Sequence, residues 1–244
     1  MNYLNIYVGN SVYKGNGIYI DKNVLPPIGD MSMRFRFSEN NYDPESEGIG
    51  VGGTWNKIIT DENVWDWSKE NVSWKESFKD SFQDPLNTID ILGTGNLSLL
   101  TDVTSLFRNC TSLNSFKGNL NHVEIMASMF YGCNKLEYIE LSSTENSTNM
   151  SSMFNGCSSL KSLPKLDTDK VVFIGYAFYN CKKIESGIYA MYSQLVSQTT
   201  PPSSHTDTFH NCGIDTVSGS AELSMIPSDW GGTANITFYK RGKS

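Results

Sequence analysis

The chain has 244 residues, which suffices for one large domain or two small ones, and a single repeat array could take up the whole length. Its hydrophobic fraction of 39% and aromatic fraction of 12% are typical of a folded protein and argue against a disordered one. The formal net charge of −7 argues against nucleic acid or an anionic membrane surface as the main partner. No apolar run reaches the roughly 18 residues that cross a bilayer, so no membrane insertion is expected.

The first part of the chain, residues 1–28, is predicted to form a β arm. Two short runs of β-branched and aromatic residues, 3–8 and 17–20, flank a stretch rich in glycine and asparagine, which favours a small hairpin. Pro26 and Pro27 then mark a linker. The arm has too few apolar residues for its own core, so we expect it to dock on the rest of the chain, a second copy or a larger assembly. The first nine residues lack the basic and apolar regions of a secretory signal, so none is expected there.

Residues 29–100 are predicted to hold an amino-terminal cap followed by a degenerate first repeat. Residues 31–37 alternate strictly, with two methionines and two phenylalanines on one face, which predicts a half-buried strand. A second strand is expected from Trp55 to Ile59. The degenerate repeat combines a helix over 73–82, with aromatic residues on one face, and a strand over 87–92.

Two features of this region resemble functional motifs. The glycine-rich run 48–53 is superficially like a dinucleotide loop, but it precedes Trp55 rather than a helix, so we interpret it as a flexible connection. Trp65 and Trp67 stand beside three acidic residues, which would suit a sugar-binding shelf. Two tryptophans in a cap more often seal the end of a core, and we favour that reading.

A six-residue sequence motif, which we call the phrase, occurs five times between Ser105 and Cys212. Each copy places a phenylalanine three residues before a cysteine, and the cysteines follow one another at steps of 23, 24, 24 and 31 residues. The ten residues are Phe107, Cys110, Phe130, Cys133, Phe154, Cys157, Phe178, Cys181, Phe209 and Cys212. Repetition at this spacing predicts a solenoid, in which stacked units bury one continuous ladder of identical side chains.

The third copy shows the predicted unit most clearly. Met150, Met153, Phe154 and Cys157 have the i, i+3, i+4, i+7 spacing of a helical stripe, and the leucines that follow predict a short strand. The fold class expected is therefore α/β, a leucine-rich-repeat-type solenoid of short helix plus short parallel strand units over 101–212. A β-rich amino-terminal arm and cap precede it, and a small carboxy-terminal cap follows.

The end of the array departs from the repeat. After Gly187 an inserted amphipathic helix of three turns is expected, whose apolar residues are Ile188, Met191, Tyr192, Leu195 and Val196. Residues 213–244 are predicted to form the carboxy-terminal cap. It should contain a short helix over 221–226, a turn over 227–232 and a last strand over 235–239.

The cysteines are interpreted as core residues. Methionine with cysteine would suit copper(I), but their shared repeat position and the helical spacing favour packing. Five is an odd number and all stand at one repeat position, so free reduced thiols are expected. The sequence has no metal-ligand spacing, phosphate-binding loop or nucleophile motif, so we expect no catalytic, cofactor-binding or metal residues and no enzyme activity.

A binding face, if the solenoid has one, should lie on the exposed side chains of its strand ladder. The candidate residues are Asp90, Lys117, Tyr138, Glu140 and Ser162. The set is small and mixed in charge, so it favours no particular ligand.

Residues 128–139 and 152–163 read Ser-Met-Phe-x-Gly-Cys-x-x-Leu, followed three residues on by isoleucine or leucine. This phrase resembles the BspA-like leucine-rich repeats of bacterial surface proteins. The flanking stretches 33–37, 53–57, 63–67 and 226–232 resemble a subgroup found in gut Bacteroidales and their phages. The resemblance implies an α/β solenoid used for binding or adhesion, without catalytic residues or a cofactor.

The chain departs from the secreted members of that family in lacking a signal and a lipid-attachment cysteine near its start. A non-enzymatic phage virion component is therefore expected first, as a capsid decoration, head fibre or tail accessory assembled in the host cytoplasm. Its arm would dock on other virion proteins while the repeats contact a host-surface protein or glycan. The alternative is a bacterial cell-surface adhesin. Homo-oligomers are compatible with both readings.

Overall fold

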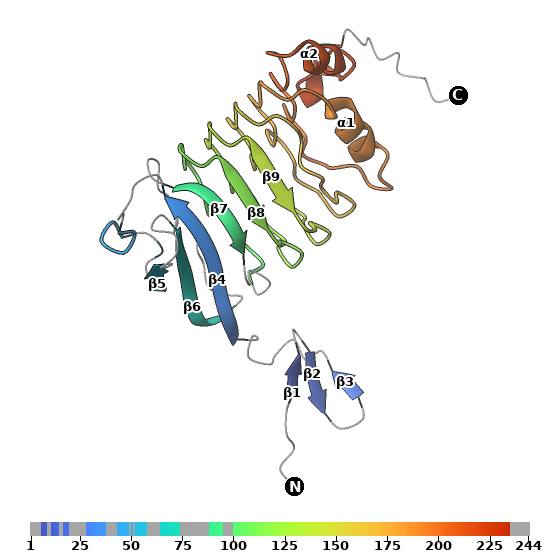
Figure 1. The fold of residues 1–244 in the computed structure, drawn as a ribbon. Coiled ribbons are helices and arrows are strands. Elements are labelled where there is room, and N and C mark those ends of the chain that lie inside the picture. Colours follow the sequence, from blue (N-terminus) through green and yellow to red (C-terminus); the bar gives the residue numbers. More distant parts are fainter. Residues whose placement is uncertain are drawn as a thin grey trace.

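The computed structural model describes residues 6–8, 11–14, 17–19, 28–37, 43–48, 50, 52–57, 64–73, 88–94 and 100–234. The helix predicted beyond Ser73 and the strand predicted over 235–239 lie outside these residues. Within them, the chain is a mixed α/β protein with two sheets and few helices (Figure 1).

The first sheet belongs to the amino-terminal arm. Its three strands are β1 (Ile6–Val8), β2 (Ser11–Lys14) and β3 (Gly17–Tyr19), and they pair antiparallel in chain order. The predicted hairpin is thus a three-stranded meander, because the stretch between the two predicted runs supplies a strand of its own. Among the described strands, these three contact only one another.

The second sheet has six strands in the order β5-β6-β4-β7-β8-β9. Its strands are β4 (Ile28–Phe37), β5 (Thr54–Lys57), β6 (Val64–Ser73), β7 (Thr88–Thr94), β8 (Ser115–Gly118) and β9 (Tyr138–Leu141). The pairs made by β4, β5 and β6 are antiparallel, whereas β7, β8 and β9 run parallel. β7 therefore joins the amino-terminal cap to the repeats.

The inner face of the cap is aromatic. Phe35 and Phe37 on β4 are buried, as the alternation predicts, and the Trp55 ring lies edge-on to Phe35 with centroids 5.0 Å apart. Trp67 on β6 is also fully buried, in agreement with a role in sealing the core. No strand was predicted from the sequence at the position of β6.

The glycine-rich run before β5 packs against Trp67. The Trp67 Nε1 donates a hydrogen bond to the Gly50 carbonyl oxygen at 2.8 Å. A Cβ atom at Gly53 would come within 2.3 Å of the indole ring. Among its described residues, the run is thus a close-fitting cover for the tryptophan, and the prediction of a merely flexible connection is wrong.

The five phrases, 105–110, 128–133, 152–157, 176–181 and 207–212, are successive turns and not helices. We number their coils I to V. The first residue of every phrase has a positive φ of 52–60°, and so does the fifth, at 56–80°. A right-handed helix tolerates no such residues, so the helical spacing of Met150, Met153, Phe154 and Cys157 arises from a different backbone. The predicted short helix in each unit is wrong.

Backbone hydrogen bonds explain how the turns stack. Every second amide in a phrase donates within its own coil, three residues back, as Cys133 does to Phe130 at 3.1 Å. The alternate amides donate to the next coil, as Phe130 does to the Met153 carbonyl oxygen at 2.9 Å. The Met129 carbonyl, in the same peptide group as the Phe130 amide, accepts from Phe107 of coil I. Peptide groups therefore form continuous chains along the stack, with their dipoles aligned.

The carboxy-terminal end contains two helices, α1 (Ile188–Val196) and α2 (Val217–Leu223), and the 3-10 helix η1 (Ser228–Trp230). The inserted helix is confirmed, with Ile188, Met191 and Leu195 buried. Of the other two predicted apolar residues, Tyr192 is only partly buried and Val196 is exposed. The predicted helix over 221–226 begins earlier, because Thr216 caps it by accepting a hydrogen bond from the Gly219 amide. The Phe209 amide of coil V donates to the Trp230 carbonyl oxygen at 2.9 Å, which ends that chain of peptide groups.

Candidate interaction faces of the repeats

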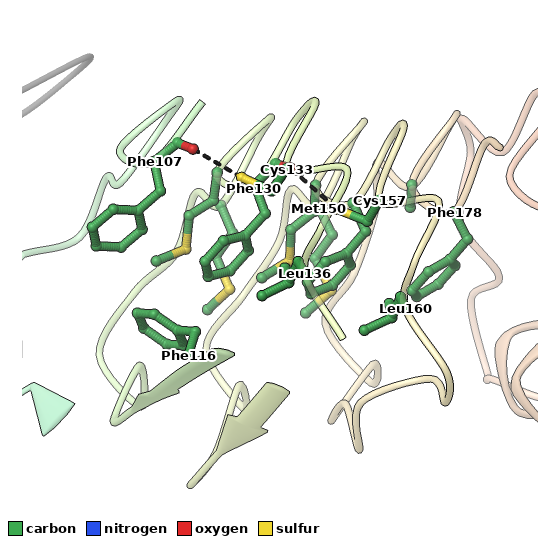
Figure 2. Close-up of a cluster of buried hydrophobic side chains, with 14 of the residues drawn as sticks. Phe107, Phe116, Phe130, Cys133, Leu136, Met150, Cys157, Leu160 and Phe178 are labelled. Atoms are coloured by element: carbon green, nitrogen blue, oxygen red, sulfur yellow. Dashed lines mark hydrogen bonds between the residues drawn. The ribbon is translucent and has the colours of Figure 1, made fainter. Parts of the chain in front are cut away.

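The interior of the repeats is a ladder of phenylalanine rings. Phe107, Phe130, Phe154, Phe178 and Phe209 are all fully buried, and consecutive rings are stacked with centroids 5.4–5.8 Å apart. Phe116 on β8 lies against two of these rings from the strand side. Figure 2 shows Phe107, Phe130 and Phe178 of this ladder in line, below the turn segments. The phenylalanines of the phrase are therefore core residues, as the sequence predicts.

The five cysteines lie beside this ladder as buried free thiols. The Sγ atoms of Cys133, Cys157 and Cys181 each donate to the phenylalanine carbonyl of the preceding coil at 3.1 Å. Figure 2 shows the hydrogen bonds of Cys133 and Cys157. Burial raises the pKa of the Cys157 and Cys181 thiols far above their ordinary value. A protonated, enclosed thiol is neither a nucleophile nor a metal ligand, so the cysteines act in packing.

Outside the core, β8 and β9 present a row of polar side chains, with residues of coil III beside them. We call this set the strand face: Lys117, Glu137, Tyr138, Glu140, Lys161 and Ser162. Lys117 and Glu140 are directly opposite in the parallel register, and their charged atoms lie 2.8 Å apart. Both side chains are more than half exposed. Solvent screens such a pair, so it contributes little to stability and stays available to a partner.

The second half of the strand face is organised by Lys161. Its ammonium group donates hydrogen bonds to the Glu137 carboxylate and to the Tyr138 hydroxyl, and it lies 4.9 Å from the centre of the Tyr138 ring. The hydrogen bond to Glu137, and then that to Tyr138, raise the pKa of Lys161 above its ordinary value. Tyr138 itself is 55% exposed. Lys161 therefore bridges the Glu137 carboxylate and the exposed Tyr138.

The five predicted face residues fall into different places. Lys117, Tyr138 and Glu140 come together on β8 and β9. Asp90 lies on β7 opposite Ser115, in the same rung as Tyr138 and not that of Lys117. Ser162 is exposed but follows the point where the strand ladder has ended.

Glu137 and Lys161 were not among the residues predicted from the sequence. They are 24 residues apart, one repeat length, and their opposite charges at equivalent positions were a usable signal.

Two other kinds of site are absent from the described part of the chain. No group of three or more histidine, cysteine, aspartate or glutamate side chains gathers there as metal ligands would. None of its helices has the length and apolar character needed to cross a bilayer.

Comparison with known proteins found one family model and one solved structure that are similar to parts of the chain. Residues 101–212 match a family model described as "Mycoplasma protein of unknown function, DUF285". A search of curated proteins found no match. Among solved structures, the chain is similar to a leucine rich cell surface protein from Faecalibacterium prausnitzii A2-165, with 19% sequence identity and a TM-score of 0.37. That similarity covers 73% of this chain, which spans 41% of the length of the other protein.

Proposed function

We propose that the chain is a non-enzymatic interaction module, built on a leucine-rich-repeat-type solenoid and displayed on a bacterial surface. The observation that carries the proposal is the complete burial of the Phe-x-x-Cys ladder. The cysteine thiols are the most reactive type of group in the repeated phrase, and burial keeps them protonated and packed in the core. What the described repeats offer to other molecules is the polar surface that the ladder supports.

The strand face is the first such surface. Lys117, Glu140 and Lys161 hold opposite charges in a fixed pattern around the exposed ring of Tyr138. A pattern of this kind suits a protein partner with complementary charges, because charge complementarity sets orientation and association rate. An exposed tyrosine supplies the contact area that such interfaces favour.

The bacterial surface is proposed as the location because the phrases at 128–139 and 152–163 resemble BspA-like repeats of surface proteins. The structural similarity to the Faecalibacterium protein has a TM-score below 0.5, so the proposal does not rest on it. Neither comparison names a phage protein, and nothing in the described residues supports the virion role that the sequence analysis put first. Docking through the arm of residues 1–28 stays a prediction.

Two measurements test the proposal. The fluorescently labelled chain is added to cultured epithelial cells, and binding is followed by flow cytometry at increasing salt. We expect saturable binding that weakens with salt and falls in the Lys117→Glu and Lys161→Glu variants, with Lys165→Glu, an exposed lysine outside the strand face, as control. Antibodies against the repeats should also label intact cells of the source bacterium. Absence of cell binding would overturn the interaction role, and labelling confined to the cytoplasm or to released phage particles would overturn the location.

A further inference from the structure

The turn segments of the repeats form a second exposed surface, which is free of charge. Segments 125–133, 149–157 and 173–181 of coils II, III and IV contain no lysine, arginine, aspartate, glutamate or histidine. They lie side by side, because Ser128 donates from its amide to the Ser151 carbonyl and Ser152 to the Gly175 carbonyl, both at 2.9 Å. Three adjacent uncharged segments contrast with the rest of the repeats, where lysine and acidic residues recur.

Tyrosines stand along this surface, which we call the turn face. Tyr131 and Tyr179 occupy the same phrase position in coils II and IV and are half-buried, and Tyr176 is 41% exposed beside Tyr179. At the same phrase position, the residues of coils I and V each cover one face of the nearer ring, Tyr131 or Tyr179. The Arg108 guanidinium lies 4.8 Å from the Tyr131 ring centre, and the His210 ring stacks on Tyr179 at 4.8 Å.

Coil III has a short side chain at this position, Asn155, where both of its neighbours have a tyrosine. Within the described residues, no ring or cation stacks on Tyr131 or Tyr179 from the side of Asn155. The fifth phrase position of coil III is Gly156, which has no side chain next to these tyrosines, whereas the Asn109 side chain covers the equivalent Gly132 of coil II. The two tyrosines thus flank a segment that offers little steric obstruction.

The turn face also has polar groups that the protein leaves unused. The hydroxyls of Ser128 and Ser152 and the amide of Asn155 are half-buried, and none of them forms a hydrogen bond with another described residue. A hydroxyl or a primary amide can both donate and accept. The surface therefore combines ring faces with neutral donors and acceptors and lacks a charged anchor over three coils.

We propose that the turn face of coils II to IV binds a neutral glycan, with a sugar ring held between Tyr131 and Tyr179 over Asn155. A pyranose has an apolar C–H face that stacks on aromatic rings and hydroxyl groups that pair with serine and asparagine. Charged ligands find no counter-charge in these segments. A protein partner would favour a desolvated apolar anchor at the centre of the surface. The methionine, phenylalanine and cysteine side chains of the phrases in coils II to IV are buried in the ladder instead, and the exposed Phe173 precedes the phrase of coil IV.

The test uses the full chain on an array of immobilised neutral mammalian, plant and fungal glycans. We expect at least one glycan class to bind, and the Tyr131→Ala and Tyr179→Ala variants each to lose about tenfold in affinity, the scale of a lost aromatic contact. The Tyr138→Ala and Lys117→Glu variants of the strand face should bind glycan as the wild type does. Raising the salt should leave glycan binding unchanged, because neither side is charged.

We expect both tyrosine variants to fold, because the two tyrosines are half-exposed and lie outside the ladder. Circular dichroism melts of each variant check this. No binding to any neutral glycan would overturn the inference, and so would equal binding by wild type and both tyrosine variants. Epithelial cells whose surface glycans have been removed enzymatically provide a second test. If the wild type still binds these cells and the two tyrosine variants do not, the turn face is a protein-binding surface and the inference is wrong. Loss of cell binding in the strand-face variants alone leaves it standing, so the two proposals fail separately.

Discussion

The Cys157 thiol donates a hydrogen bond to the Phe130 carbonyl oxygen of the preceding coil, with an Sγ–O distance of 3.1 Å. The same carbonyl accepts the Cys133 amide, also at 3.1 Å. Cys157 thus connects two coils from inside the core, and Cys133 and Cys181 repeat the contact. Because cysteine is small, apolar and a weak donor, it suits a position beside the ring ladder where a larger side chain would collide.

Replacing one of these cysteines should weaken the stack without unfolding it. We expect Cys157→Ala to lower the free energy of unfolding by about 1–2 kcal/mol, because a fully buried sulfur leaves a small cavity while the Phe130 carbonyl keeps its amide donor. Denaturant unfolding followed by circular dichroism measures the change. Ser162→Ala, at an exposed position, should have no measurable effect, and equal stability of both variants would contradict the packing role.

The thiols should be unreactive until the chain unfolds. Burial raises the pKa of Cys133, Cys157, Cys181 and Cys212, so their reactive thiolate forms are scarce at neutral pH and remain so in mildly alkaline solution. Iodoacetamide should leave the native protein unmodified at neutral pH. In guanidinium chloride all five free cysteines should react, as counted by mass spectrometry. Rapid labelling of the native state, or fewer than five sites after denaturation, would contradict the buried free-thiol ladder.

The fifth position of each phrase should accept asparagine and reject β-branched residues. Gly156 has φ of +80°, and a Cβ atom there would only come within 3.6 Å of the Gly132 backbone. Asn109, Asn180 and Asn211 adopt positive φ at the equivalent place. Gly156→Asn should therefore be nearly neutral, whereas Gly156→Val should cost about 1–3 kcal/mol through backbone strain. Thermal melts of the two variants decide the matter, and comparable losses would show that the conformation is not what selects the residue.

The carboxy-terminal helices should depend on Glu222. Its carboxylate on α2 accepts hydrogen bonds from the Gly187 amide at 3.1 Å and the Tyr189 amide at 2.9 Å, at the start of α1. A negative charge there satisfies free amides and interacts well with the helix dipole. Glu222→Ala should lower the free energy of unfolding by about 1 kcal/mol in denaturant titrations. The exposed Glu185→Ala serves as control, and no difference between the two would refute the capping role.

The sequence predicted which residues are buried better than it predicted the backbone that buries them. The positions of Met150, Met153, Phe154 and Cys157 fit a helix, and all four are buried, but alternate amides donate to the next coil. The i, i+3, i+4, i+7 spacing indicates only that these residues face the same side of the backbone. A turn with two residues in the left-handed region places residues of this spacing on one side as well. The serine at the first phrase position of coils I to III did not indicate a left-handed backbone conformation, because serine rarely adopts a positive φ.

The candidate faces were predictable in part. Lys117 and Glu140 were identified because strands expose alternate residues, but Lys161 lies in a stretch without a strand, where alternation gives no guidance. The turn face escaped notice because a helix over 152–157 would place Asn155 and Gly156 differently from the turns observed. Contacts such as that between Tyr179 and His210 join residues 31 positions apart, and only the stacking of coils brings them together.

The repeated phrase acts as a scaffold, and binding occurs on the two surfaces that this scaffold supports, the strand face and the turn face. Epithelial-cell binding, measured by flow cytometry well below the melting temperature, tests it directly when a scaffold variant and a face variant are compared. Cys157→Ala should lower the free energy of unfolding and bind cells as the wild type does. The double variant Lys117→Glu, Lys161→Glu should keep its stability and lose cell binding. Loss of binding in Cys157→Ala with full binding by the double variant would contradict the account.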